Sequence, residues 1–281
     1  MSIDVKNLSF SYGHHEVLHD LSFSIPDNML VNVLGVGKST LFRCILCLNA
    51  NWTGEITVNG KNLRDLSVRE RSREIAYIPQ SHSSTYDYDV LDVVLMSAGG
   101  NIGLFGTPKK QHVDRAWEAL DRVGIASLGH RPYTQISGGE KQLVLIARAI
   151  AQNARTIVMD EPTSALDYGN TVRVLSTVRQ LAREGMSIVQ STHQPDQAFL
   201  YSDRTLVINE GRVHAFGDHH EGAGEHHLPR GRGGQFPVWR QGARLRARTR
   251  DRAIGSKSKN DERKAPWEGR KHERQRGQRA C

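Results

Sequence analysis

Apolar and polar residues alternate with a repeat of two along the first part of the chain. The clearest stretches are residues 3–12 (IDVKNLSFSY) and 21–25 (LSFSI), and residues 54–60 (GEITVNG) alternate similarly and end in Asn-Gly. Such alternation is typical of strands with one buried face, and Asn-Gly is typical of a tight hairpin turn. The pattern therefore predicts a layer of antiparallel strands near the amino terminus.

Short apolar runs and helical periodicity alternate through much of the remaining chain. Residues 81–136 lose the strand pattern and are expected to be mostly helical. This order predicts a mostly parallel α/β sheet with two accessory layers. We expect strands at 29–34, 156–159 and 186–192, helices at 140–152 and 171–184, and a final hairpin at 204–216.

Two adjacent carboxylates follow the apolar run at residues 156–159 (TIVM). A run without polar residues is typical of a strand buried on both faces of a parallel sheet, and ligands bind at the carboxyl ends of such strands. Asp160 is therefore a candidate for holding Mg²⁺ through water, and Glu161 for orienting and deprotonating an attacking water. The alternative is a solvated acidic pair at a strand end.

A second candidate site is the polar turn before the predicted helix at residues 140–152. Ser137, Gly138 and Gly139 leave backbone amides accessible at the positive end of this helix, which suits a phosphate group. Ser137 followed by Glu140 three residues later is also the pattern of an ordinary helix cap. The turn alone does not decide between these interpretations.

The segment NVLGVGKST contains the end of a phosphate-binding loop, whose full pattern is G-x-x-x-x-G-K-[ST]. Counting back from Gly37 and Lys38, the first glycine belongs at position 32, which is Asn32. Gly35 leaves one spacer residue where four belong, so three residues are missing, and they would span about 10 Å when extended. Lys38 and Ser39 are retained, but much of the amide cradle is lost. We therefore expect impaired binding of a nucleotide's phosphate groups.

These motifs occur together in one order: GKST at 37–40, YIPQ at 77–80, ISGGEKQLVLIARAIAQ at 136–152, DEPTSALD at 160–167 and STHQ at 191–194. As a set, they resemble the nucleotide-binding subunit of an ABC transporter over residues 1–217. The resemblance implies an α/β fold, a P-loop NTPase cassette with an antiparallel β layer and a helical subdomain near residues 81–136. It also implies that ATP and Mg²⁺ are the cofactors and that ATP hydrolysis is the activity.

The resemblance also assigns roles to single residues whose types would otherwise be read as structural. It implies that Tyr12 stacks on adenine, that Gln80 contacts Mg²⁺ and water, and that His193 contacts the γ-phosphate. Ser137 to Gly139 would face the nucleotide of an opposite cassette, and Asp167 in SALD would connect the two cassettes. The nucleotide-binding residues implied are Tyr12, Gly35, Gly37, Lys38, Ser39, Thr40, Ser137, Gly138, Gly139 and Asp167; the metal ligands are Ser39, Gln80 and Asp160; the catalytic residues are Glu161, His193 and Gln80.

Within the family, VLDVVLM at 90–96 and STHQPDQAF at 191–199 resemble importers of iron-siderophore, haem or cobalamin-type chelates. This implies transmembrane permease subunits, a second cassette and, indirectly, a substrate-binding protein, with the chain on the cytoplasmic face of the membrane. No apolar stretch approaches the roughly 20 residues of a membrane-spanning helix. Two alternatives are a catalytically inactive cassette that only docks to a partner and a soluble ABC protein acting on nucleic acid.

Charge divides the chain unevenly. Residues 218–281 hold 17 of the 38 Lys and Arg residues and 8 of the 30 Asp and Glu residues, so residues 1–217 are nearly neutral. Because this basic tail has few apolar residues and no sustained periodicity, we expect it to be disordered. It could be an arm for nucleic acid or another anionic surface, a solvated extension, or the product of a changed reading frame.

Overall fold

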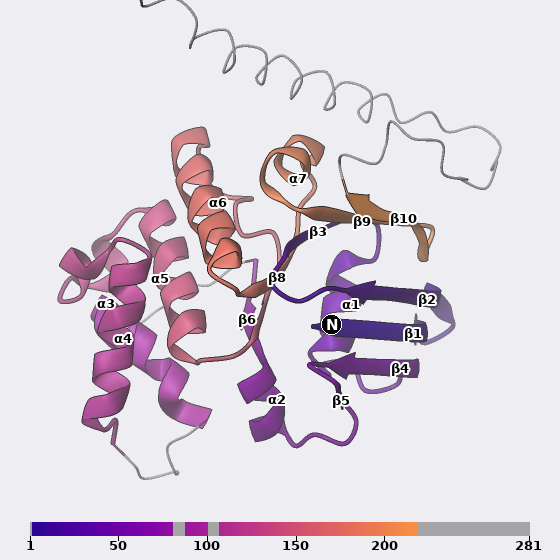
Figure 1. Ribbon diagram of the computed structural model, residues 1–281, viewed down its shortest axis with the longest axis horizontal. Helices are drawn as coiled ribbons and strands as arrows, with labels where there is room; N and C mark the ends of the chain where they lie inside the picture. Colours follow the sequence, from indigo (N-terminus) through magenta and orange to yellow (C-terminus); the bar gives the residue numbers. More distant parts are fainter. Residues whose placement is uncertain (1, 81–87, 101–106, 219–281) are drawn as a thin grey trace, which may run out of the picture. The chain divides into compact units, whose positions relative to one another are not determined.

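The computed structural model describes residues 2–80, 88–100 and 107–218 of the 281-residue chain. The predicted basic tail beyond Asp218 lies outside the described residues, as do residues 81–87 and 101–106 of the predicted helical region. Two sheets and several helices make up the described part (Figure 1).

The first sheet is antiparallel and has the strand order β2-β1-β4-β5. Its strands β1 and β2 pair from Ile3 opposite Ile25 to Tyr12 opposite His15, and β4 turns into β5 at Asn59-Gly60. This layer and its hairpin confirm the prediction from the alternating pattern. The strands are β1 (Ile3–Tyr12), β2 (His15–Ile25), β4 (Thr53–Val58) and β5 (Lys61–Asn62).

The second sheet has the order β10-β9-β3-β8-β7-β6, in which only β10 runs antiparallel to its neighbour. All four residues of β7 are buried, as expected for a strand covered on both faces. The predicted strand at 156–159 is confirmed with the same bounds. The strands are β3 (Leu30–Gly35), β6 (Ile75–Ile78), β7 (Thr156–Met159), β8 (Ser187–Ser191), β9 (Arg204–Asn209) and β10 (Arg212–Asp218).

Two long helices begin earlier than the apolar periodicity predicts, because capping side chains extend them. Ser137 accepts a hydrogen bond from the Glu140 amide, so α5 begins at Gly138, and Asp167 does the same for Asn170, so α6 begins at Tyr168. The helices are α1 (Lys38–Ile45), α2 (Val68–Glu74), α3 (Val90–Leu95), α4 (Lys110–Arg122), α5 (Gly138–Ala151), α6 (Tyr168–Arg183) and α7 (Pro195–Tyr201).

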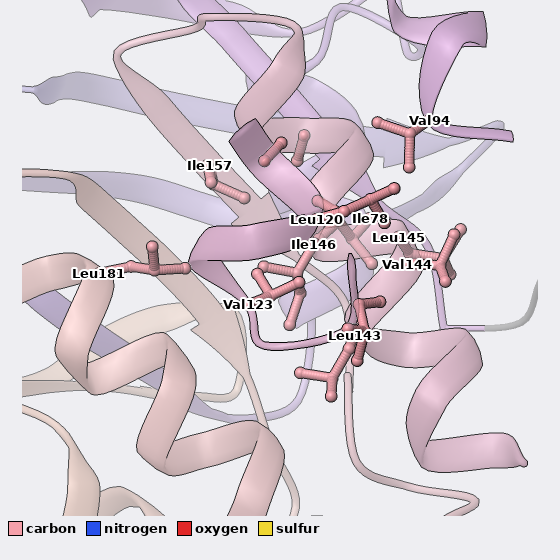
Figure 2. Packing of buried hydrophobic residues seen from close by; sticks show 14 of the residues in the cluster. Ile78, Val94, Leu120, Val123, Leu143, Val144, Leu145, Ile146, Ile157 and Leu181 are labelled. Carbon is pink, nitrogen blue, oxygen red and sulfur yellow. The ribbon is translucent and has the colours of Figure 1, made fainter. Parts of the chain in front are cut away.

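Helices α3, α4 and α5 pack together, with short 3₁₀ segments at Met96–Gly100, Ala126–Leu128 and Tyr133–Gln135. Figure 2 shows their side chains meeting those of the sheet, including Leu120 and Ile146 beside Ile78. The described parts of residues 81–136 are therefore mostly helical, as predicted.

A second core lies between the two sheets and around α1, where Phe42 is fully buried. This packing anchors α1 from its inner face, so the helix does not depend on the loop before it for its position. None of the helices in the described part has the length and apolar character of a membrane span.

Candidate functional site

Four strands of the parallel sheet end near one cluster of polar side chains. Gln80 follows β6, Asp160 and Glu161 follow β7, His193 follows β8, and Lys38 begins the helix after β3. Because parallel strands end at the same edge, the topology brings together residues that lie far apart in sequence.

Glu161 is the centre of this cluster. Its Oε2 accepts a hydrogen bond from Gln80 Nε2 at 3.1 Å and lies 3.3 Å from His193 Nδ1. Its Oε1 lies 3.6 Å from Lys38 Nζ. The structure thus places Lys38, Gln80, Glu161 and His193, all identified from the sequence, in one group, with the carboxylate positioned to take part in proton transfer and to orient a bound group.

Asp160 is 7 % exposed and accepts a hydrogen bond from Ser191 Oγ to its Oδ1 at 2.6 Å. The same Ser191 hydroxyl accepts a hydrogen bond from the Glu161 amide at 2.8 Å. Sequence reasoning missed Ser191. The available signal was a polar residue at the end of a buried strand, two positions before His193.

The connection between β3 and α1 is short: Val36 and Gly37 alone separate Gly35 from Lys38. The strand does not unwind to lengthen this loop, because Gly35 pairs with Ile208 of β9 and the Val36 amide donates to the Ile208 carbonyl at 3.3 Å. Gly35 has φ +104, and a Cβ there would lie 1.7 Å from that carbonyl oxygen. Only glycine fits this position.

Backbone donors remain at the start of α1. The first intrahelical bond runs from the Leu41 amide to the Gly37 carbonyl, so the amides of Lys38, Ser39 and Thr40 have no partner within the helix. Residues 35–40 line a cavity of about 340 Å³. These amides fit a phosphate group, while Lys38 Nζ donates to the Gly35 carbonyl at 3.1 Å.

Oxygen donors suited to Mg²⁺ are the Ser39 hydroxyl, the Gln80 amide oxygen and the Asp160 carboxylate, since this hard cation prefers oxygen ligands. Among the residues that the structure describes, no group of three or more His, Cys, Asp or Glu side chains forms a metal cluster.

Tyr12 lies at the end of β1, with its side chain 45 % exposed. Its hydroxyl accepts hydrogen bonds from Asn49 Nδ2 at 3.2 Å and Arg43 Nη1 at 3.5 Å. The Asn49 hydrogen bond is the main cause that lowers the pKa of Tyr12. The ring is accessible for stacking, and its hydroxyl is tied to the end of α1.

Ser137, Gly138, Gly139 and Asp167 form a second group at the starts of α5 and α6. Ser137 and Asp167 cap these helices, and the Asn170 amide bond lowers the pKa of Asp167. A Cβ on Gly139 would lie 2.2 Å from Asn170 Oδ1, so the two helix starts touch. The side chains of Ser137 and Asp167 form hydrogen bonds with Glu140 and Asn170, within these two helix starts.

Comparison with known proteins places these features in one family. The sequence pattern described as ABC transporter matches residues 18–164. An ABC transporter ATP-binding protein of Haemophilus influenzae is 41% identical over 213 residues, which are 75% of this chain and 81% of that protein. A Helicobacter pylori protein named for iron chelatin transport is 34% identical over 76% of this chain and 86% of its own length.

A solved structure of a metal-chelate type ABC transporter in an inward-facing conformation is also similar. Its matching chain has 36% sequence identity and a TM-score of 0.68, and the match covers 77% of this chain and 83% of that one.

Proposed function

The chain belongs to the ABC transporter family, and on that premise we propose that it is the ATP-binding and ATP-hydrolysing subunit of an importer for iron-siderophores or related metal chelates. The Glu161 cluster is the observation that carries the hydrolytic part of this proposal. The iron chelatin name of one relative and the metal-chelate transporter structure support the proposed cargo class.

Each member of the cluster has a defined task in the proposed reaction. Glu161 orients the attacking water and takes its proton, while Gln80 and His193 hold the carboxylate through Oε2. Lys38 and the free amides of α1 bind phosphate oxygens, and Tyr12 stacks on the adenine. Asp160, Ser39 and Gln80 would hold Mg²⁺, which neutralises charge on the phosphates when bound.

The proposed partners are transmembrane permease subunits and a second copy of the cassette, with a substrate-binding protein acting indirectly. Ser137, Gly138 and Gly139 at the start of α5 would contact the nucleotide held by the second cassette, and Asp167 would lie at that same interface. The permease would hold the chain at the cytoplasmic face of the membrane. The nearly neutral charge of residues 1–217 supports this reading over action on nucleic acid.

The short phosphate loop adds a second part to the proposal: this chain hydrolyses ATP slowly. The Val36 amide bonds to β9, and Lys38 bonds to the Gly35 carbonyl and lies beside Glu161, so the cradle has fewer donors for phosphate. Loss of one preorganised hydrogen-bond donor in a catalytic site costs on the order of 100-fold in rate. The same observation favours a second candidate, an inactive cassette that docks to a permease without turnover.

Both candidates can be tested with a version of the chain that has three residues inserted between Gly35 and Val36. The nucleotide affinity and the ATPase rate are measured for this version and for the original chain. We expect the inserted version to bind ATP more tightly and to turn over with permease present. Equal turnover by the two versions would contradict the role of the loop. Absence of ATP binding and turnover in both would contradict the proposed hydrolytic function.

Uptake of an isotope-labelled ferric siderophore tests the cargo. Cells that carry the permease and the inserted version should accumulate the label, and cells with its Glu161→Gln variant should not. Equal accumulation in both would exclude this chain as the motor for that cargo.

A further inference from the structure

We infer that Ser191 is a positioning residue for hydrolysis, because one buried hydroxyl holds both neighbouring carboxylate residues at the end of β7. The inference rests on the proposed function, since it concerns the same Asp160 and Glu161. Ser191 Oγ donates to Asp160 Oδ1 at 2.6 Å and accepts from the Glu161 amide at 2.8 Å. A hydroxyl has one proton and two lone pairs, so both bonds form at once.

Burial makes these two bonds difficult to replace. Ser191 is 0 % exposed and Asp160 is 7 % exposed. Hydrogen bonds to a charged group are stronger than neutral ones, and low polarity around them strengthens them further. Removing the hydroxyl leaves a buried carboxylate oxygen and a backbone amide without this partner.

The backbone of Glu161 gives an independent reason for a positioning role. Glu161 has φ +46, in the left-handed region that residues other than glycine seldom adopt. Its amide points to Ser191 in this conformation, and its carboxylate reaches Lys38, Gln80 and His193. Ser191 therefore holds Glu161 in the backbone geometry in which its carboxylate lies at the centre of the cluster.

The register of β8 fixes Ser191 in turn. Ser191 pairs with Val33 of β3, and the Thr192 amide donates to the Val33 carbonyl at 3.2 Å. The hydroxyl thus lies between the strand that carries the carboxylates and the strand that leads to the phosphate loop. Through its two hydrogen bonds, this hydroxyl links Asp160, the proposed metal ligand, with Glu161, the proposed general base.

Ser187 provides a matched control on the same strand. It is 4 % exposed, and its hydroxyl accepts a hydrogen bond from the Asn28 amide at 2.9 Å, at the amino end of β8. Replacement by alanine removes a buried hydroxyl from either position, but only Ser191 contacts the carboxylates.

Crystal structures of the full chain and its Ser191→Ala, Ser191→Thr and Ser187→Ala variants test the geometry without requiring activity. In Ser191→Ala we expect Glu161 to leave positive φ and its Oε2 to move about 1 Å or more from Gln80 and His193, a shift of the size that affects rates. Ser191→Thr and Ser187→Ala should keep the cluster. An unmoved Glu161 in Ser191→Ala, or a displaced one in Ser187→Ala, would overturn the inference.

Kinetics in the version with the inserted loop test the consequence. Ser191→Ala should lower kcat about 100-fold and raise the Mg²⁺ concentration for half-maximal rate, with ATP binding in the absence of Mg²⁺ unchanged. Ser191→Thr should recover the rate, because it keeps the hydroxyl. Undiminished kcat in Ser191→Ala, or no recovery in Ser191→Thr, would overturn the positioning role. If the parent itself fails to hydrolyse ATP, the proposed function fails, and the crystal structures still decide the role of Ser191.

Discussion

The carboxylate side and the phosphate-loop side of the candidate site differ in how completely the chain builds them. At the ends of β6, β7 and β8, Gln80 and His193 contact Glu161, and Ser191 holds its amide. At the end of β3, two residues join the strand to α1, and the Val36 amide bonds to β9. The register of the sheet and the packing of Phe42 position the strand ends and α1 without the loop. The fold therefore positions the catalytic side chains independently of the backbone loop that would bind phosphate.

The largest effect should come from breaking the carboxylate side alone. In the version with the inserted loop, Glu161→Gln should lower kcat about 1,000-fold, because the amide cannot take a proton from water. ATP binding should persist, since Glu161 carries no proposed contact to the phosphates. Steady-state ATPase assays with permease and equilibrium binding measure the two quantities. Unchanged turnover would remove Glu161 from the role of general base.

Repairing the phosphate-loop side should give the next largest effect. Inserting three residues between Gly35 and Val36 should raise the ATPase rate about 100-fold, because the inserted residues add backbone amides that complete the cradle around the phosphates beside Lys38. A matched insertion at the exposed Gly60, in the turn between β4 and β5, should leave the rate unchanged. An equal rate before and after the Gly35 insertion would show that the short loop already cradles phosphate.

The second group of residues allows a finer separation of structural and functional roles. Ser137→Ala and Ser67→Ala each remove a serine of a capping box, at α5 and α2, and each should cost about 1 kcal/mol of unfolding free energy. Only Ser137→Ala should also weaken ATP-dependent pairing of cassettes. Denaturant unfolding measures the change in stability. Sedimentation in the presence of ATP measures the pairing, in the inserted-loop version that also carries Glu161→Gln so that nucleotide is not hydrolysed. Equal pairing in both variants would leave Ser137 a cap alone.

The smallest effect on stability should follow removal of residues 219–281. Their few apolar side chains leave little surface to bury, so we expect an unchanged melting temperature by calorimetry. Binding to heparin should disappear with this segment and weaken steeply with salt in the full chain. A large fall in the melting temperature would contradict the composition argument.

Sequence patterns predicted the parallel core well, because β7 is a run of four apolar residues that ends at two carboxylates. Gln80 and His193 were predicted only from the resemblance to a family, and the structure places both beside Glu161. The early starts of α5 and α6 depend on side-chain caps, which apolar periodicity does not detect. Ser191 was missed because its contacts with Asp160 and Glu161 depend on the pairing of β3, β7 and β8, and the paired residues are distant in sequence.

The two glycines that flank Val36 make the connection between β3 and α1 a suitable position for inserting a segment. Gly35 is held against β9 and Gly37 has φ +97 at the start of α1, while the Val36 side chain between them is 72 % exposed. β3 and α1 are thus both held by their packing, and Val36 between them is exposed to solvent. A segment spliced in at that position, whether a few residues or a small folded module, has room to extend outward while β3 and α1 retain their core packing.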